Sequence, residues 1–86
     1  MLLAIDIGNT NVVLGLFQGN RLLTNLRLAT DMRRSADEYG ITIDQMFRYE
    51  GIDPADVDDV IISTVVPSLL FTMQHMCLKY FKCTPL

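Results

Sequence analysis

The sequence predicts an α/β domain with a mixed sheet, whose elements follow the order β-β-β-α-β-α. Three observations predict this order. Short apolar runs separated by Gly and Asn turn signals fill residues 2–29, a three- and four-residue apolar period begins after Ser35, and a β-branched run over Val60–Val66 precedes a second helical pattern. With 86 residues, 50% of them hydrophobic and 20% charged, the chain suits one folded domain and is too apolar for a disordered segment.

The opening of the chain predicts an antiparallel meander. Leu2–Ile7 is almost wholly apolar, which is typical of a short strand covered on both faces. The turn signals Gly8–Thr10 and Gln18–Asn20 separate it from the strands predicted over Asn11–Phe17 and Arg21–Ala29. The third strand alternates apolar and polar residues, so we expect a half-solvated strand at the edge of the sheet. Its buried face is predicted to carry Leu22, Thr24, Leu26 and Leu28.

A helix is predicted to begin after Ser35. Ser35 followed three residues later by Glu38 is a capping-box signature, and Gly51 supplies a C-terminal stop. Asp53 before Pro54 predicts the cap and the first residue of a short helical turn. The long helix should pack through Ala36, Tyr39, Ile43, Met46 and Phe47.

The last third of the chain predicts a strand, a helix and the beginning of another strand. The strand over Val60–Val66 should end at Pro67, and Thr84–Leu86 can begin a fifth strand. Because a crossover helix usually joins parallel strands, Val60–Val66 should run parallel to Leu2–Ile7. Without a fifth strand, Val60–Val65 forms an unpaired apolar edge, which predicts self-association or strand exchange. The second helix should pack through Leu69, Leu70, Met73, Met76, Cys77, Tyr80 and Phe81.

Composition argues against several classes of partner. The net charge is −3, and Arg27, Arg33 and Arg34 form the only basic cluster, so we expect no nucleic-acid partner. No apolar run approaches the roughly 20 residues of a membrane span, so we expect no membrane association. Cys77 and Cys83 are too few for a disulfide scaffold, and on one helix roughly 9 Å of rise would separate them. We therefore expect a cytoplasmic protein.

The most informative segment follows the first predicted strand. Burying the Asp6 carboxylate at the end of an apolar strand is costly unless a metal ion or hydrogen-bond donors compensate it. Gly8 permits positive φ and close backbone approach, while Asn9, Thr10 and Asn11 bring polar groups to a turn whose amides can converge on an anion. This pattern predicts a phosphate-binding turn with Asp6 as a magnesium ligand.

Two interpretations of this segment stay open. Asp6 and Asn9 can instead make the local hydrogen bonds of an ordinary hairpin. If the fourth strand lies parallel to and beside the first, Ser63 and Thr64 end near the same sheet edge as Asp6, where open α/β sheets usually bind ligands. Two hydroxyl groups in a buried strand are also common, so this arrangement gives modest support to the ligand-binding interpretation.

Several segments together resemble one enzyme family. Leu3–Phe17 contains Asp6-Ile7-Gly8-Asn9-Thr10-Asn11 and then Gly15-Leu16-Phe17, which is similar to the first phosphate motif of type III pantothenate kinases. Ile62-Ser63-Thr64-Val65-Val66-Pro67 resembles the family's Ser-rich Val-Val-Pro segment, and Arg27 and Thr30 precede Asp37-Glu38-Tyr39 in the family's manner. The resemblance covers the whole chain. It implies half of a ribonuclease H-like, actin-like ATPase fold, with residues 1–86 as a single amino-terminal nucleotide-binding domain that is incomplete.

The resemblance also implies a reaction, the ATP-dependent phosphorylation of pantothenate to 4′-phosphopantothenate in coenzyme A synthesis. The family works as homodimers with magnesium and a monovalent cation, potassium or ammonium. Asp6 would hold magnesium and phosphate, Gly8 and Asn9 would permit close backbone approach, and Thr10 and Asn11 would contact phosphate oxygens. The base that accepts the substrate proton is expected downstream, so no catalytic residue is assigned in this chain. The implied nucleotide-binding residues are Asp6, Ile7, Gly8, Asn9, Thr10, Asn11, Val12 and Val13.

The remaining polar residues favour structural roles. His75 lies off the apolar stripe of its helix and should face solvent, whereas Cys77 should be a buried apolar residue. Arg33 and Arg34 favour a solvated pair, and the acids over residues 53–59 lack calcium-loop spacing and should be caps and surface charge. A second functional hypothesis is a noncatalytic binding or regulatory module with the same fold, of the transcription-accessory type.

Overall fold

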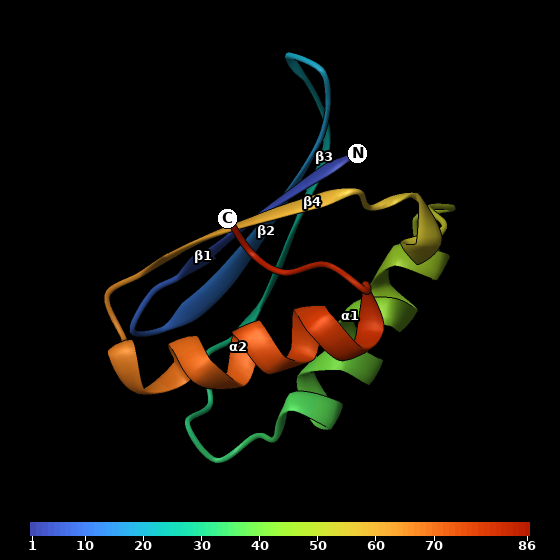
Figure 1. Cartoon of the computed structure of the whole chain (residues 1–86). Helices are drawn as coiled ribbons and strands as arrows, with labels where there is room; N and C mark the ends of the chain where they lie inside the picture. The colour runs from blue at the N-terminus through green and yellow to red at the C-terminus, as the bar shows by residue number, and fades with distance from the viewer.

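The computed structural model describes residues 1–86 and contains a four-stranded sheet, two α-helices and one short 3₁₀ helix (Figure 1). The strand order across the sheet is β3-β2-β1-β4, so the first strand is central and the third and fourth strands are at the edges. The predicted α/β class and the edge position of the third strand are confirmed. The strands are β1 (Leu2–Ile7), β2 (Asn11–Gln18), β3 (Arg21–Ala29) and β4 (Asp59–Thr64).

The pairing confirms the predicted mixture of antiparallel and parallel strands. β1 pairs antiparallel with β2, and β2 pairs antiparallel with β3, which makes the meander. β4 lies on the other side of β1 and runs parallel to it. The register sets Asp6 of β1 beside Val13 of β2 and Ser63 of β4. The carboxyl ends of β1 and β4 therefore meet at one edge of the sheet.

The helix boundaries follow local capping chemistry. α1 spans Ala36–Tyr49, and its capping box is complete: the Glu38 N–H donates to Ser35 Oγ over 3.1 Å, and the Ser35 N–H donates to Glu38 Oε1 over 2.9 Å. The 3₁₀ helix η1 spans Pro54–Asp56, with the Asp53 side chain accepting from an amide in its first turn. Both predicted helix starts are confirmed.

The predicted ends of the fourth strand and second helix are displaced by a few residues. β4 ends at Thr64, before the predicted end at Val66, and α2 begins at Pro67 and runs to Tyr80. Proline suits the first position of a helix because its missing N–H has no partner there. No fifth strand forms, and that expectation is wrong for these residues. Instead, the Leu86 N–H donates to the Val60 carbonyl oxygen over 2.7 Å, at the outer edge of β4.

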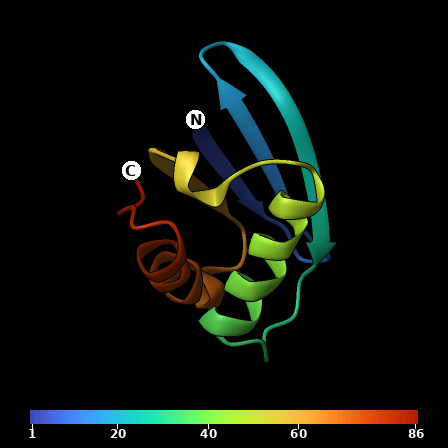
Figure 2. The same ribbon diagram turned by 90° about the vertical axis from the view of Figure 1, so that its right-hand side faces the viewer.

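Both α-helices lie on one face of the sheet, as Figure 2 shows from the side. Along β1, buried residues alternate with exposed or half-buried ones, and Asp6 is exposed. The expectation that this strand is covered on both faces is therefore wrong. We call the side away from α1 and α2 the open face. The strand residues buried under the helices are Leu3, Ile5, Ile7, Val12, Leu14, Leu16, Leu28 and Val60.

The far end of the β2–β3 hairpin extends beyond the helices. Leu28 is buried as predicted, but Leu22 is 47% exposed, so its assignment to the buried face is wrong. An irregularity in the pairing between Leu16 and Phe17 shifts the register at this point. Leu22 therefore pairs with Phe17 and lies beside Gly15 on the open face, away from the core.

Side chains of α1 and α2 complete the core on the face of the sheet that the helices cover. Tyr39, Ile43 and Phe47 of α1 are buried, and Ala36 packs partly exposed against the core. Met46 is half-buried and is not among the residues that pack against this core, which differs from its predicted role. From α2 and the residues after it, the buried side chains are Leu69, Met73, Met76, Cys77, Phe81 and Cys83. Leu70 and Tyr80 are half-buried rather than fully buried. The helical periods predicted from the sequence thus identify the core faces of both helices.

Cys77 and Cys83 are both buried, and neither forms a disulfide bond. They do not share a helix, because α2 ends at Tyr80 and Lys82 takes a positive φ of 57°, which turns the chain back. The Cys83 N–H then donates to the Cys77 carbonyl oxygen over 3.4 Å. Burial raises the pKa of the Cys77 thiol to about 12, so this thiol is inert at neutral pH. No helix of the structure has the length and apolar character needed to span a bilayer.

The contact between α1 and α2 depends on a glycine. A Cβ added at Gly40 would overlap the Tyr80 ring, which lies directly against the α1 backbone. Beside this contact the Asp37 carboxylate accepts from Lys79 Nζ over 2.8 Å and from the Tyr80 hydroxyl over 2.9 Å. Close helix approach and a cross-helix ion pair therefore occur at the same point.

We expect Gly40→Ala to destabilise the fold by about 2 kcal/mol, because overpacking outweighs the helix propensity gained by alanine. The measurement is urea unfolding followed by circular dichroism. Gln45→Ala, at an exposed position of the same helix, is the matched control and should change little. An unchanged unfolding midpoint for Gly40→Ala would show that the two helices do not approach this closely.

The Asp37 cluster also predicts how stability depends on pH. Hydrogen bonds from Lys79 and Tyr80 hold the pKa of Asp37 below its ordinary value. A lowered carboxyl pKa adds stability above the unfolded pKa of about 4, and this stability is lost as pH falls through the lower folded pKa. We expect Asp37→Asn to flatten the loss of stability below about pH 4. Asp59→Asn, which removes a carboxylate without such bonds, should leave that slope unchanged.

Candidate functional site

The turn between β1 and β2 is an incompletely closed hairpin. The Gly8 N–H donates to the Asn11 carbonyl oxygen over 2.9 Å, as in an ordinary two-residue turn. The reciprocal bond from the Asn11 N–H is missing, and the Gly8 carbonyl oxygen accepts from the Thr30 hydroxyl over 2.7 Å. The Thr30 N–H donates to the Thr10 carbonyl oxygen over 2.9 Å. Two carbonyls of the turn are therefore bonded to the end of β3.

The amides at the tip of the turn are free. The N–H groups of Asn9 and Thr10 donate to no carbonyl of the chain, and both residues are exposed. The Asp6 and Asn9 side chains make no hydrogen bond of the kind that an ordinary Asx turn requires. Exposed backbone donors in a turn can bind an anion. The side-chain hydrogen bonds expected of an ordinary hairpin are absent, and the anion-binding interpretation stays a prediction.

Glycine suits position 8 because the Asn11 carbonyl oxygen lies close to its Cα, and not because its φ is positive. A Cβ at this position would lie 3.1 Å from the Asn11 carbonyl oxygen, tighter than ordinary contact. Positive φ occurs only at Gly19, Gly51 and Lys82. The positive φ that glycine permits is therefore not used at Gly8.

Asp6 is not buried, which corrects the argument that its burial needs compensation. Its side chain is exposed on the open face, where it forms no ion pair or hydrogen bond. Ser63 sits beside it on β4 and is also exposed, while Thr64 pairs with Ile7 in the register. Ser63 and Thr64 therefore reach the same sheet edge as Asp6, as predicted. The Thr64 hydroxyl accepts from the Val66 N–H over 2.8 Å, so it already serves the β4–α2 junction.

The other predicted site residues divide between the two faces of the sheet. Ile7 and Val12 are fully buried in the core, so their side chains face away from any ligand on the open face. Val13 is half-buried on the open face between Asp6 and Arg27 in the register. The structure therefore brings together Asp6 and the turn at one edge and gives Ile7 and Val12 a packing role.

Residues of the loop that follows β3 form hydrogen bonds with one another. Arg33 donates to Asp31 from its backbone N–H over 2.9 Å and from Nε over 3.2 Å, and these bonds lower the pKa of the Asp31 carboxyl. The Arg34 guanidinium lies 5.8 Å from the centre of the Tyr39 ring. The two arginines are therefore engaged separately, which corrects the expectation of a simple solvated pair. Thr30, which bonds the turn, was not among the predicted ligand residues.

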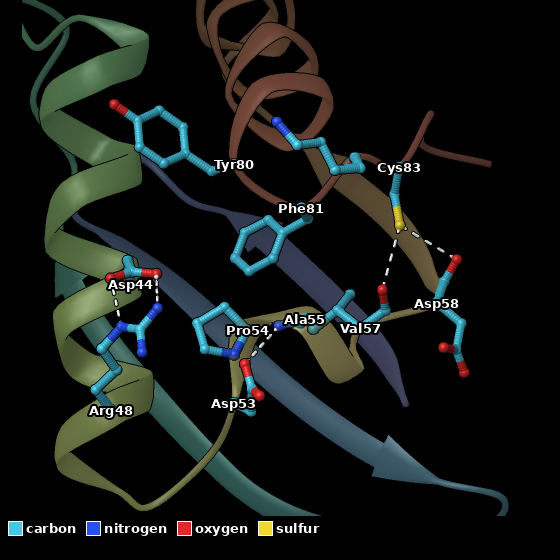
Figure 3. Close-up of a pocket in the computed structure, with 11 residues that line it drawn as sticks. Asp44, Arg48, Asp53, Pro54, Ala55, Val57, Asp58, Tyr80, Phe81 and Cys83 are labelled. Atoms are coloured by element: carbon cyan, nitrogen blue, oxygen red, sulfur yellow. Dashed lines mark hydrogen bonds and ion pairs between the residues drawn. The ribbon is translucent and has the colours of Figure 1, made fainter.

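A cavity of about 480 Å³ lies between α1, η1 and the end of α2, far from the turn (Figure 3). Its charged groups are already paired: Arg48 Nε bonds Asp44 over 2.9 Å, and Asp53 accepts from Ala55 over 2.9 Å. Asp58 pairs with the amino terminus over 2.9 Å. These pairings confirm the acids of this region as caps and surface charge. None of the three cavities of the molecule includes the turn.

The side chains of the turn can hold a metal ion only together with other ligands. No group of three His, Cys, Asp or Glu side chains in the structure could hold one alone. Asp6 is a single unpaired carboxylate, and magnesium is commonly held by one or two carboxylates together with phosphate oxygens and water. The donor set therefore fits a magnesium ion that arrives with a phosphate ligand. His75, the only histidine, is exposed on α2, as predicted.

Comparison with known proteins identifies the family. The sequence profile of type III pantothenate kinases matches residues 2–86. A type III pantothenate kinase from Myxococcus xanthus strain DK1622 is 51% identical over 86 residues, which is the whole of this chain. The chain belongs to the type III pantothenate kinase family. The chain spans 34% of the length of that relative.

Solved structures agree on the fold of this chain. A hexokinase of the ROK class from Thermus thermophilus superimposes with a TM-score of 0.70 at 16% identity, over 98% of this chain and 33% of that one. A protein from Sinorhizobium meliloti described as a putative 2-dehydro-3-deoxygalactonokinase gives 0.54 at 21% identity, over 76% and 21%. The expected fold, that of the sugar kinases and actin-like ATPases, is confirmed.

Proposed function

We propose that this chain supplies the phosphate-binding part of an enzyme that phosphorylates pantothenate to 4′-phosphopantothenate with ATP, a step of coenzyme A synthesis. One observation carries the proposal. The unpaired amides of Asn9 and Thr10 and the unpaired Asp6 carboxylate lie at the same end of β1. Membership of the kinase family supports a phosphate as the anion that these donors bind.

The turn suits a triphosphate because it combines donors with a carboxylate. The N–H groups of Asn9 and Thr10 would donate to phosphate oxygens, and the side chains of Thr10 and Asn11 can add further donors. Gly8 leaves room for close approach of the ligand to the backbone. Asp6 would hold a magnesium ion, which neutralises phosphate charge during transfer. Neither Ile7 nor Val12 would contact the nucleotide through its side chain.

The proposed reaction is an in-line transfer. A pantothenate hydroxyl oxygen bonds to the γ-phosphorus as the bond between that phosphorus and the ADP oxygen breaks, and the hydroxyl proton passes to a base. No residue of this chain is assigned as that base. A monovalent cation, potassium or ammonium, would act in the complete enzyme. Within these residues, catalysis consists of positioning the phosphates and neutralising their charge.

Asp6→Asn tests the proposed magnesium role. We expect magnesium-dependent binding of ATP to weaken about tenfold or more, because an amide is a poorer ligand for a hard cation than a carboxylate. The measurement is calorimetric titration of this chain with ATP, with and without magnesium. Asp59→Asn makes the same charge change at the opposite end of β4 and should bind like wild type. Identical heats for wild type and Asp6→Asn would instead favour a noncatalytic binding or regulatory module.

We also propose that the chain forms a homo-oligomer through the outer edge of β4, by pairing or exchange of strands. The Val65 N–H donates to the Ile7 carbonyl oxygen, so the odd-numbered residues of this segment face β1. The even-numbered Ile62 and Thr64 therefore direct their backbone groups outward, where no strand pairs with them. Such an edge recruits extended segments of another chain. We further propose the cytoplasm as its location, consistent with two unbonded cysteines.

Sedimentation velocity tests this edge. We expect the wild-type chain to form dimers at high concentration, and Ile62→Pro to shift it toward monomer by removing an outward-facing N–H. Circular dichroism would verify that the variant stays folded. Gln45→Ala, on a helix far from β4, is the control and should dimerise normally. A monomer at every concentration of the wild-type chain contradicts the proposal.

A further inference from the structure

We infer that Thr30 is a positioning residue for the phosphate-binding turn, an inference that rests on the proposed function of that turn. Thr30 directly follows β3 and lies 22 positions after Gly8 in the sequence. Its hydroxyl donates to the Gly8 carbonyl oxygen over 2.7 Å, and its N–H donates to the Thr10 carbonyl oxygen over 2.9 Å. One residue therefore holds two carbonyls of the turn.

The bond to the Gly8 carbonyl oxygen determines where the Asn9 N–H points, and the bond to the Thr10 carbonyl oxygen orients the Thr10–Asn11 peptide. In a planar trans peptide the N–H is directed opposite to the carbonyl oxygen. Because the Gly8 carbonyl points to Thr30, the Asn9 N–H of the same peptide points away from β3. The Gly8 carbonyl oxygen accepts from the Thr30 hydroxyl, and the Asn11 N–H makes no bond to it. Thr30 thereby fixes the orientation of the Gly8–Asn9 peptide.

Thr30 is itself held to the core by the next residue. The Asp31 N–H donates to the Tyr39 hydroxyl over 2.9 Å, and that hydroxyl donates to the Asp31 carbonyl oxygen over 2.8 Å. Tyr39 is 0% exposed and belongs to the packed face of α1. The turn is therefore connected to the helix layer through Thr30, Asp31 and Tyr39, although β3 is an edge strand.

A purely structural role for Thr30 makes a different prediction from a positioning role. If the hydroxyl only stabilised the fold, its loss would lower the free energy of unfolding and leave the folded turn and its ligand binding unchanged. If it positions the turn, its loss makes the turn mobile in a protein that remains folded. The backbone order of Asn9 and Thr10 and the affinity for phosphate separate the two roles.

The experiment compares Thr30→Val, which keeps the shape and removes the hydroxyl, with Thr30→Ser, which keeps the hydroxyl. Thr24→Val is the matched control, because Thr24 lies on the same strand and its hydroxyl bonds Glu50 over 3.3 Å. The readouts are NMR order parameters for the Asn9 and Thr10 amides and calorimetric binding of magnesium ATP. Circular dichroism establishes that each variant is folded.

We expect Thr30→Val to weaken magnesium ATP binding about tenfold, the value of one well-formed hydrogen bond, and Thr30→Ser to restore it. The order parameters of both amides should fall from about 0.85 toward about 0.6 in Thr30→Val only. Tyr39→Phe, which removes the hydroxyl holding Asp31, should shift both readouts in the same direction. This variant keeps the inference testable if Thr30→Val fails to fold.

Unchanged order parameters in folded Thr30→Val, or weaker binding that Thr30→Ser does not restore, would overturn the inference. A wild-type chain that binds no magnesium ATP would refute the proposed function. In that case the order parameters alone still decide whether Thr30 holds the turn, so failure of the inference and failure of the proposed function are distinguishable.

Discussion

The arrangement of the molecule depends on the pairing of β1 with two different neighbours. β1 pairs antiparallel with β2 and parallel with β4, so its carboxyl end adjoins both a tight turn and the β4–α2 junction. The alternation of side chains along β1 then sends Leu3, Ile5 and Ile7 into the core and Asp6 to the open face. A shift of one residue in this register would bury Asp6 and expose the core. The same pairing therefore sets both the stability of the sheet and the location of the carboxylate.

The turn between β1 and β2, which we propose binds phosphate, combines a local backbone hydrogen bond with one hydrogen bond from a distant residue. The Gly8 N–H donates to the Asn11 carbonyl oxygen, as expected for a two-residue loop. The Gly8 carbonyl oxygen instead accepts from the hydroxyl of Thr30, which follows β3. The donors of Asn9 and Thr10 gain no partner in the chain, and a free amide at an exposed tip is satisfied by water or by an anion. The proposed function depends on these amides, which have no partner within the chain.

Local chemistry explains which parts of the fold were predictable. Ser35 and Glu38 form the capping box that their spacing indicates, and the apolar periods identify the packed faces of both helices. The two wrong expectations for β1 and Leu22 have different causes. An apolar strand indicates burial without saying how many layers cover it, and here both helices cover the same face. The irregularity between Leu16 and Phe17 pairs Leu22 with Phe17 and so moves Leu22 to the open face. Layer count is a property of the assembled chain.

The sequence by itself determined the family and the order of the elements, and it indicated the segment that we propose binds phosphate, because these depend on residue types at short spacing. Tertiary structure alone decided that Asp6 is exposed, that Ile7 and Val12 are packing residues, and that Thr30 holds the turn. The physical reason is distance along the chain. A hydrogen bond between residues 22 positions apart forms only after three strands have paired in register, and no local pattern encodes it.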